Sequence, residues 1–347
     1  MSVFESPSFD DHELVHFASD ATTGLQTIIA VHSTALGCAC GGCRLWPYRS
    51  SEEALEDVLR LSRGMSYKNA LAGISLGGGK AVIIADAAMK TAELMRAFGR
   101  VVERLGGRYV TAEDVGVTVQ DMQFVAEETR FVHGLPHENR AGGDPSPYTA
   151  QGVFLGMKAA LTHRFGRADF RGIRVLVQGV GSVGFNLCKI LHAAGAELIV
   201  ADVDGTRLER VKASLPVTIV GVADLVTQEA DIYAPCALGA VLNDETIPVL
   251  KSGIVAGAAN NQLARAEHGE MLRQRGILYA PDYVINSGGI INVWSEMNCL
   301  TKESVCEKIS RIYDTALKIF KKADEQGSTS NRVADEMALA LMQRKAT

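Results

Sequence analysis

The second half of the chain alternates apolar, β-branched segments with helical ones, and this alternation limits the possible folds most strongly. The apolar runs are IRVLVQGV, AELIVADV, VTIVG, ADIYAPC, GIVAGAA and ILYAPDYVI, and the helical segment SVGFNLCKILHAAG separates the first two. Strands that are apolar along their whole length are typical of a parallel sheet covered by helices on both faces. The pattern therefore predicts an α/β fold with a doubly wound sheet in this part of the chain.

A glycine-rich turn joins the first of these strands to its helix. The stretch VLVQGVGSVG has the pattern G-x-G-x-x-G, in which the first glycine makes the turn, the second lets a pyrophosphate approach the backbone and the third allows close helix packing. Backbone N–H groups at the start of the helix then face the diphosphate. This predicts a Rossmann-type dinucleotide site formed by Gly179, Val180, Gly181, Ser182, Val183 and Gly184.

The next strand, ELIVAD, ends in an acidic residue at the spacing expected for ribose binding. Asp202 follows Gly179 by 23 residues, and a carboxylate there accepts hydrogen bonds from the adenosine ribose and repels a 2′-phosphate. We therefore expect NAD rather than NADP, although Arg207 nearby leaves the strictness of this preference open. The alternatives are a glycine turn without ligand and, for Asp202, a helix cap.

The length of the chain predicts two domains with a cleft between them. At 347 residues it exceeds the size at which one hydrophobic core usually stops growing. The segment GGDPSPY marks a boundary, so we expect an α/β substrate and catalytic domain in residues 1–141 and the NAD-binding domain in residues 142–327. The C-terminal helix, about residues 328–347, is expected to pack back onto the first domain.

The first part of the chain mixes helices and strands. The segments SSEEALEDVLRLSRG and TAELMRAFGRVVERLGG have apolar residues at helical spacing, and each is expected to end at its glycine. The segments LQTIIAVHS, KAVIIAD and RYVTAED are typical of strands. This part of the chain is therefore expected to build helices around a sheet of its own.

Charge and cysteine usage exclude several classes of protein. The net charge of -5 provides no basic surplus for nucleic acid, and no segment approaches the ~20 apolar residues that span a membrane. The N-terminal segment MSVFESPSFDDHELVHF has no features of a secretory signal. Seven scattered cysteines are typical of reduced thiols, and CACGGC lacks paired C-x-x-C units, so we expect a cytoplasmic protein without a metal site.

Two lysines of the first part are candidates for chemistry. Lys80 follows three glycines in GISLGGGKAVIIAD, where Ile74 and Ala81 occupy the positions that a phosphate-binding P-loop needs for Gly and Ser or Thr. The apolar run after Lys80 provides surroundings that favour the neutral amine of a general base. We expect the glycines to let substrate and cofactor approach closely; a purely structural turn is the alternative. Lys68, in RGMSYKNA, is expected just after the end of a helix.

An acidic pair ends one of the predicted strands of the same part. Glu113 and Asp114 lie in YVTAEDVG, where the loop after a strand can carry site residues. A helix cap or an exposed surface pair is the alternative for these carboxylates. Lysine and carboxylate together are the groups that amine chemistry needs.

Several long segments, in their order along nearly the whole chain, resemble the Glu/Leu/Phe/Val amino acid dehydrogenase family. They are GGCRLWPY, LRLSRGMSYKNALAGISLGGGKAVII, AFGRVVERLGGRYVTAEDVG, GGDPSPYTAQGV, VQGVGSVG, APCALGAVLN, GAANNQL and YVINSGGIINV. The pattern is nearest to the leucine dehydrogenases of the leucine, valine, phenylalanine and tryptophan branch. The resemblance implies NAD-dependent, reversible oxidative deamination of an L-amino acid to a 2-oxo acid and ammonium.

The resemblance also implies roles for individual residues. Lys80 would activate the water that attacks the imine carbon, Asp114 would shuttle protons to and from the amino group, and Lys68 would bind the substrate carboxylate with help from Asn261. Thr149 would contact the nicotinamide. Further residues would contact the cofactor, namely Ala237 and Asn261, or let the substrate lie close to the backbone, namely Gly41 and Gly42.

The substrate side chain would face a pocket without cationic residues. By resemblance the pocket is formed by Cys40, Met65, Ala112, Ile290 and Val293. A glutamate carboxylate would be unpaired there, so glutamate is disfavoured. Ala112 and the β-branched Ile290 point to branched aliphatic substrates. The family usually has GPALGG where this chain has GCACGG, so Cys40 enlarges the pocket slightly, and Trp294 could shape its rim.

Two alternatives remain open at this point. The chain could be a phenylalanine or tryptophan dehydrogenase, or a NAD-binding sensor on a catalytically dead scaffold. Intact Lys68, Lys80, Asp114 and Asn261 argue against the sensor, because a binding protein does not need a desolvated base. The resemblance implies a homo-oligomer, either a dimer or an octamer, that binds small molecules and neither nucleic acid nor membrane.

Overall fold

The computed structural model describes residues 2–135 and 141–346. The chain divides into two compact units. The first unit consists of Met1–Pro145, Ile290–Val305 and Ala338–Thr347, and the second consists of Ser146–Gly289 and Cys306–Met337. The first unit therefore includes two later segments of the chain. The functional domains expected at residues 1–141 and 142–327 stay a prediction.

The first unit contains a mixed five-stranded sheet. Its strands are β1 (Leu14–Asp20), β2 (Leu25–Ser33), β3 (Ala39–Trp46), β4 (Gly77–Ile84) and β5 (Tyr109–Glu113). Their order across the sheet is β1-β2-β4-β3-β5. Strand β2 is antiparallel to β1 and β4, whereas β3 is parallel to both β4 and β5. Strands β1 and β3 are not predicted from the sequence, and β3 contains Cys40 and Cys43 of the cysteine cluster.

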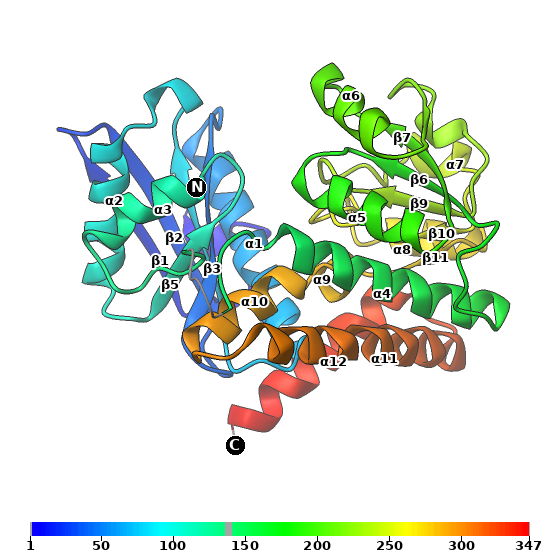
Figure 1. Ribbon diagram of the computed structural model, residues 1–347. Helices are drawn as coiled ribbons and strands as arrows, with labels where there is room; N and C mark the ends of the chain where they lie inside the picture. Colours follow the sequence, from blue (N-terminus) through cyan, green and yellow to red (C-terminus); the bar gives the residue numbers. More distant parts are fainter. Residues whose placement is uncertain (1, 136–140, 347) are drawn as a thin grey trace. The chain divides into compact units, whose positions relative to one another are not determined.

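Helices cover both faces of this sheet. Figure 1 shows α1 (Ser51–Leu71) on one side and α2 (Ala92–Arg104) and α3 (Val119–Ala126) on the other. In β4, Val82 packs with residues of α1, whereas Ala81 and Ile83 pack with residues of α2. Because side chains alternate along a strand, Lys80 lies on the same face as Val82, beneath α1. The short 3-10 helices of this unit are η1 (Val3–Glu5) and η2 (Ala87–Met89).

Helix α1 is longer than the sequence predicts. It begins as expected, with the Ser50 hydroxyl accepting a hydrogen bond from the Glu53 N–H at 3.2 Å. The end predicted at Gly64 is wrong, because the helix continues to Leu71 and places Lys68 in its last turn. A glycine inside a helix costs only about 0.5–1 kcal/mol, which packing against the sheet offsets. The Asn69 amide adds a hydrogen bond to the Gly77 carbonyl at 2.7 Å.

Other protein atoms occupy the space where side chains of the three glycines before Lys80 would lie. A Cβ on Gly78 would lie 2.2 Å from the backbone nitrogen of Ser66 in α1, and one on Gly79 would lie 2.8 Å from the Tyr109 ring. A Cβ on Gly77 would meet the Ser33 carbonyl oxygen at 2.2 Å. The expectation that these glycines give substrate and cofactor room is therefore wrong. Gly78 allows helix α1 and strand β4 to pack in close contact, whereas Gly77 allows close contact with the end of β2 and Gly79 makes room for the Tyr109 ring of β5.

The second unit contains the predicted parallel sheet. Its strands are β6 (Arg174–Gln178), β7 (Glu197–Ala201), β8 (Thr218–Ile219), β9 (Ile232–Pro235), β10 (Ile254–Val255) and β11 (Leu278–Tyr279). All neighbouring pairs are parallel, in the order β11-β10-β9-β6-β7-β8. This is the Rossmann order, with its reversal between β6 and β9. The predicted α/β fold class is confirmed.

Helices connect these strands and complete the chain. They are α4 (Ser146–Phe165), α5 (Ser182–Ala193), α6 (Gly205–Ser214), η3 (Leu225–Thr227), α7 (Thr246–Val249), α8 (His268–Gln274), α9 (Asp282–Ile285), α10 (Gly288–Met297), α11 (Lys302–Gln326) and α12 (Ser330–Ala346). The last residues of α12, from Ala338 on, belong to the first unit. Within the described residues, we find no helix with the length and apolar character that crossing a membrane requires.

The close packing of α1 on β4 predicts opposite effects of two alanine substitutions. Gly78→Ala should destabilise the protein by about 1–3 kcal/mol, because the added methyl group forces α1 away from β4. Gly64→Ala is the matched control, since no atom lies within 4 Å of its added methyl group. It should stabilise the protein by about 0.5–1 kcal/mol. Urea unfolding measures both values, and a Gly78→Ala protein as stable as the parent would contradict this packing.

Candidate active site

A buried ion pair joins two of the predicted site residues in the first unit. Lys80 is 5% exposed, and its Nζ lies 2.7 Å from Oδ2 of Asp114. The two residues come from β4 and from the end of β5, which are separated by β3 in the sheet. Gly42 of β3 makes room for the pair, because a Cβ there would lie 2.8 Å from the Asp114 Cβ. The structure therefore brings the predicted base and proton shuttle into contact.

The charges around Asp114 keep its carboxyl group ionised. Burial alone would raise the pKa of Asp114, but the positive charges of Lys80 and Arg44 lower it well below its usual range. The Arg44 Nε lies 3.3 Å from Asp114 Oδ2, the same oxygen that contacts Lys80. Asp114 is therefore ionised at neutral pH, and the positive charges of Lys80 and Arg44 balance its negative charge.

Arg44 belongs to a larger network that the sequence analysis missed. Its Nη1 lies 2.9 Å from Oδ2 of Asp57 in α1, and the Tyr48 hydroxyl donates to the same oxygen at 2.6 Å. One guanidinium group thus bridges two carboxylates, which its planar set of donors allows. The available signal was an arginine inside an otherwise apolar segment, CGGCRLW.

The predicted pocket residues of β3, β5 and α1 lie close to this pair. Cys40 is fully buried, and its strand pairs with β5 so that Gly42 is opposite Ala112. A Cβ on Gly41 would lie 3.2 Å from the Met65 side chain. Burial raises the pKa of the Cys40 thiol far above its usual value, so it is a neutral wall residue. Lys68 is half-buried one turn after Met65 on α1, over the face that carries Lys80.

The remaining pocket residues, Ile290 and Val293, lie on α10. Two polar side chains of this helix fix it to the first unit. Glu296 is 8% exposed and accepts a hydrogen bond from the Gly134 N–H at 2.9 Å, and Asn292 accepts one from Gly142 at 3.0 Å. These two anchors are not among the residues predicted from the sequence, although the signal for them is a pair of polar residues four apart on an apolar helix.

The carboxyl group of Glu113, the neighbour of Asp114, has a raised pKa. Burial raises the pKa of Glu113 to about 7, and the negative charges of Asp144 and Asp114 add to this shift. A carboxyl group with this pKa exchanges its proton near neutral pH. The sequence marked Glu113 as a candidate without assigning it a role.

The glycine motif of the second unit has the predicted local geometry. Gly179 has φ +93° and its Cβ position is 2.7 Å from the Ala237 Cβ, while a Cβ on Gly184 would lie 1.9 Å from the Gly179 carbonyl oxygen. Gly181 is open, since the nearest atom to its Cβ position is an Arg207 Nη1 at 3.8 Å. Helix α5 begins directly after it. Two glycines thus serve packing, and the middle one leaves the space that a pyrophosphate needs.

Asp202 has a structural role in addition to the predicted one. Its side chain is 3% exposed, and its two oxygens accept the backbone N–H groups of Val180 and Asp204 at 2.8 and 2.9 Å. Each carboxylate oxygen still has a second lone pair for a ribose hydroxyl. Arg207 lies 3.8 Å from the same carboxylate and is half exposed. The ribose contact stays a prediction.

Of the other predicted contacts of the second unit, Thr149 and Asn261 are half-buried and Ala237 is exposed. Thr149 lies in the first turn of α4, and Asn261 has a left-handed backbone with φ +52°. The Asn261 carbonyl accepts a hydrogen bond from Ala240 at 2.7 Å, which fixes this conformation. Because Asn261 and Lys68 belong to different units, their joint binding of a carboxylate stays a prediction.

Two parts of the chain match models of known protein families. Residues 12–131 match the family model described as Glu/Leu/Phe/Val dehydrogenase, dimerisation domain, and residues 204–345 match Glutamate/Leucine/Phenylalanine/Valine dehydrogenase. The chain belongs to the Glu/Leu/Phe/Val dehydrogenase family. This confirms the predicted resemblance, the two-part α/β fold and the enzyme class, an NAD-dependent amino acid dehydrogenase.

Members of this family with different named substrates are similar to the chain. The leucine dehydrogenase of Thermoactinomyces intermedius is 50% identical over 97% of this chain and 93% of its own length. The phenylalanine dehydrogenase of Bacillus thermotolerans is 48% identical over 97% and 89%. The crystal structure of L-tryptophan dehydrogenase from Nostoc punctiforme has a TM-score of 0.81 and 45% identity, and covers 97% of both chains.

The bridging position of Arg44 predicts a large effect of its removal. Arg44→Ala should destabilise the protein by about 1–3 kcal/mol, because it leaves two partly buried carboxylates without their shared partner. Arg273→Ala is the matched control, since Arg273 pairs with Glu270 at 2.6 Å on the exposed surface and should matter little. Thermal unfolding of both variants at neutral pH provides the comparison. Equal effects would contradict a structural role of the Arg44 network.

The raised pKa of Glu113 predicts a pH-dependent effect on stability. Its folded pKa of about 7 lies above the unfolded value of about 4.3, so the stabilisation is complete below pH 4.3 and is lost as pH rises through 7. Compared with Glu113→Gln, the parent protein should therefore become progressively less stable between these pH values. Urea unfolding of both proteins across this range measures the difference. A difference that does not change with pH would contradict the shift.

Proposed function

We propose that this chain catalyses the NAD-dependent, reversible oxidative deamination of branched aliphatic L-amino acids to 2-oxo acids and ammonium. The observation that carries the proposal is the buried Lys80–Asp114 pair at 2.7 Å, in a chain of the amino acid dehydrogenase family. The amine and the carboxylate are the two groups that proton transfer at an amino-bearing carbon requires. The open space at Gly181 and the start of α5 fit the diphosphate of NAD.

NAD held at Gly181 and the start of α5 would supply the acceptor for the hydride of the α-carbon, and the substrate would then carry an iminium group. Lys80 then removes a proton from the water that attacks this carbon. Asp114, in contact with Lys80, accepts a proton from the substrate ammonium group before hydride transfer and returns it to the nitrogen when ammonia departs. Lys68 holds the α-carboxylate through its positive charge, with the Asn261 amide as a second contact.

Arg44 supports this proton transfer without contacting the reacting atoms. When Lys80 gives up its proton, Asp114 loses one of its two positive neighbours. The Arg44 guanidinium keeps its charge, because arginine is not deprotonated in proteins. It therefore favours the carboxylate form of Asp114, to which Asp114 returns when it gives its proton to the departing ammonia.

Preference for leucine, valine or isoleucine follows from the lining of the pocket. Cys40 is a neutral thiol, and Ala112 and Val293 are buried and apolar. A branched side chain gains from burial against such a surface, whereas a glutamate carboxylate would have no cation to pair with. Phenylalanine or tryptophan is the second candidate, because relatives named for these substrates are almost as similar to the chain.

The assembly and location of the protein are part of the same proposal. We propose a homo-oligomer, dimer or octamer, because residues 12–131 match a domain described by its role in dimerisation. Cytoplasmic location is supported by the cysteines, all seven of which are free thiols.

The reaction is tested with purified protein, NAD and each of the proteinogenic L-amino acids at alkaline pH, with NADH absorbance as the readout. We expect leucine, valine or isoleucine to give the highest kcat/KM. A lead by phenylalanine or tryptophan would confirm the chemistry and contradict the proposed pocket. Activity with none of them would contradict the enzyme proposal and favour a NAD-binding sensor.

The proposed ribose contact predicts the effect of Asp202→Asn. The asparagine oxygen can still accept one of the two backbone N–H groups, while the charge that repels a 2′-phosphate is removed. The ratio of kcat/KM for NAD over NADP should fall about tenfold, the value of one contact of about 1.4 kcal/mol. Steady-state kinetics with both coenzymes measure this ratio. An unchanged ratio would contradict the role of Asp202 in coenzyme choice.

A further inference from the structure

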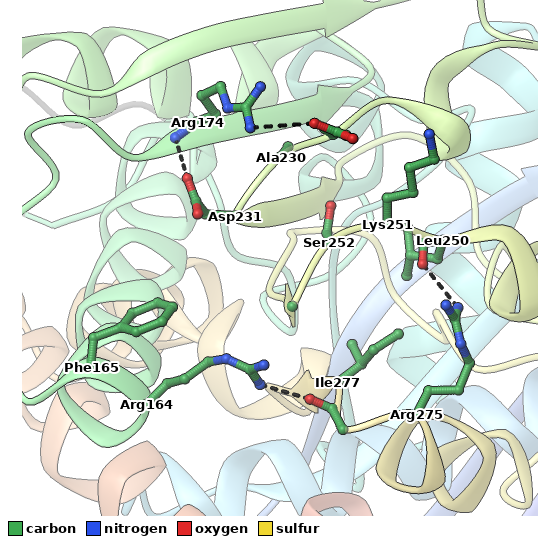
Figure 2. A pocket seen from close by; sticks show the side chains of 13 residues that line it. Arg164, Phe165, Arg174, Ala230, Asp231, Leu250, Lys251, Ser252, Arg275 and Ile277 are labelled. Atoms are coloured by element: carbon green, nitrogen blue, oxygen red, sulfur yellow. Dashed lines mark hydrogen bonds and ion pairs between the residues drawn. The ribbon is translucent and has the colours of Figure 1, made fainter.

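The second unit has a cavity at the edge of its sheet opposite to the glycine motif. The cavity has a volume of about 590 Å³ and is shown in Figure 2. Its lining includes Arg174, which opens β6, and Asp231, Gly253 and Ile277, which directly precede β9, β10 and β11. Because parallel strands share the same direction, these residues lie at their amino ends, whereas Gly179 follows the carboxyl end of β6. The cavity is therefore separate from the proposed NAD site.

The charges around the cavity are unequally compensated. One of its four cations, Arg174, faces carboxylates: its Nη2 lies 4.0 Å from Glu229, and its backbone N–H donates to Asp231 at 2.8 Å. Figure 2 shows Arg174 and Asp231 together on one side of the cavity. The carboxylates of Glu229 and Asp231 outnumber the positive charge of Arg174 by one, so with all four cations the cavity lining keeps a surplus of two positive charges.

The other three cations have no carboxylate partner among the residues that the structure describes. The Arg164 and Arg275 guanidinium groups donate to the backbone carbonyls of Gly276 at 2.7 Å and Leu250 at 2.9 Å. Carbonyl groups orient these side chains but do not neutralise them. Lys251, also on the rim, is exposed. The cavity therefore carries a net positive charge with pre-oriented donors.

A buried hydroxyl group in the lining of the same cavity has no hydrogen-bond partner among the described residues, as expected where a ligand supplies the acceptor. Ser252 is 2% exposed, and its Oγ has no hydrogen-bond partner within the described part of the chain. Figure 2 shows this hydroxyl between the Arg174 group and the guanidinium groups of Arg164 and Arg275. An unsatisfied buried hydroxyl costs about 1–3 kcal/mol, which a ligand oxygen would remove.

We propose that this cavity binds a small organic phosphate. A surplus of two positive charges and an unpartnered hydroxyl donor favour an anion, and donors from separate elements suit the several oxygens of a tetrahedral phosphate better than the two of a planar carboxylate. The volume lies within the range of about 300 to 1,000 Å³ that is typical of ligand sites and exceeds the needs of a bare phosphate ion. Phe165, 47% exposed, and Ile277 offer apolar contact to an organic group.

The test is a calorimetric titration of the full-length protein with glucose 6-phosphate, at saturating NADH so that the dinucleotide site is occupied. Inorganic phosphate is titrated in parallel. Binding of glucose 6-phosphate that is tighter than that of inorganic phosphate is the expected result. Equal affinities would show a site for the phosphate ion alone and would overturn the organic ligand. Absence of binding of both at millimolar concentration would overturn the site.

Variants separate a built site from general attraction of anions. Lys251→Glu should weaken binding about tenfold, the effect of one charged contact. Lys212→Glu is the matched control, because it makes the same charge change at an exposed position on α6, away from the cavity lining, and should leave affinity nearly unchanged. Equal losses in both variants would overturn the proposal.

Ser252→Ala tests the hydroxyl without a risk to folding. Removal of an unpartnered buried hydroxyl should leave the stability of the unliganded protein unchanged or higher. The variant should nevertheless bind glucose 6-phosphate several-fold more weakly. Unchanged affinity would show that the hydroxyl does not contact the ligand and would overturn its part in the site. None of these three positions belongs to the proposed catalytic residues, so dehydrogenase activity serves as an independent check of folding.

Discussion

The contact between the Lys80 amine and the Asp114 carboxylate is the interaction on which the rest of the first unit depends. Removing two charges from water costs several kcal/mol per ion, so such a pair persists only where geometry and further partners offset this cost. Here the Lys80 Nζ lies 2.7 Å from Oδ2 of Asp114, and the Arg44 guanidinium contacts the same oxygen. The fold supplies the geometry, because β3 separates the two strands and has a glycine where Asp114 passes.

Close packing of α1 on β4 completes this arrangement. Gly78 lacks the side chain that would hold the helix away from the sheet, and the Asn69 amide of α1 donates a hydrogen bond to the Gly77 carbonyl. Helix α1 therefore brings Lys68 to the face of the sheet that carries Lys80. The same helix carries Asp57, which anchors the far end of Arg44. One helix thus connects the proposed carboxylate-binding cation with the network around the proposed base.

Much of this could be predicted from the sequence, for identifiable reasons. The parallel sheet and its glycine turn depend on local patterns, so apolar strands, helix periods and the G-x-G-x-x-G spacing were enough. The continuation of α1 through Gly64 was not predictable, because a distant strand stabilises it. For the same reason the true role of the glycines before Lys80 was missed: their neighbours, Ser66 and Tyr109, come from other elements. Arg44 and Glu296 became visible only through their partners in space.

The central claim is that Lys80 acts as the base, and the turnover of Lys80→Ala tests it most directly. We would measure kcat with the best substrate of the parent enzyme, with and without added methylamine, and NADH binding in parallel. The account predicts that turnover is lost, that NADH still binds and that the small amine restores part of the activity. A variant with near-normal kcat in the absence of methylamine would contradict it.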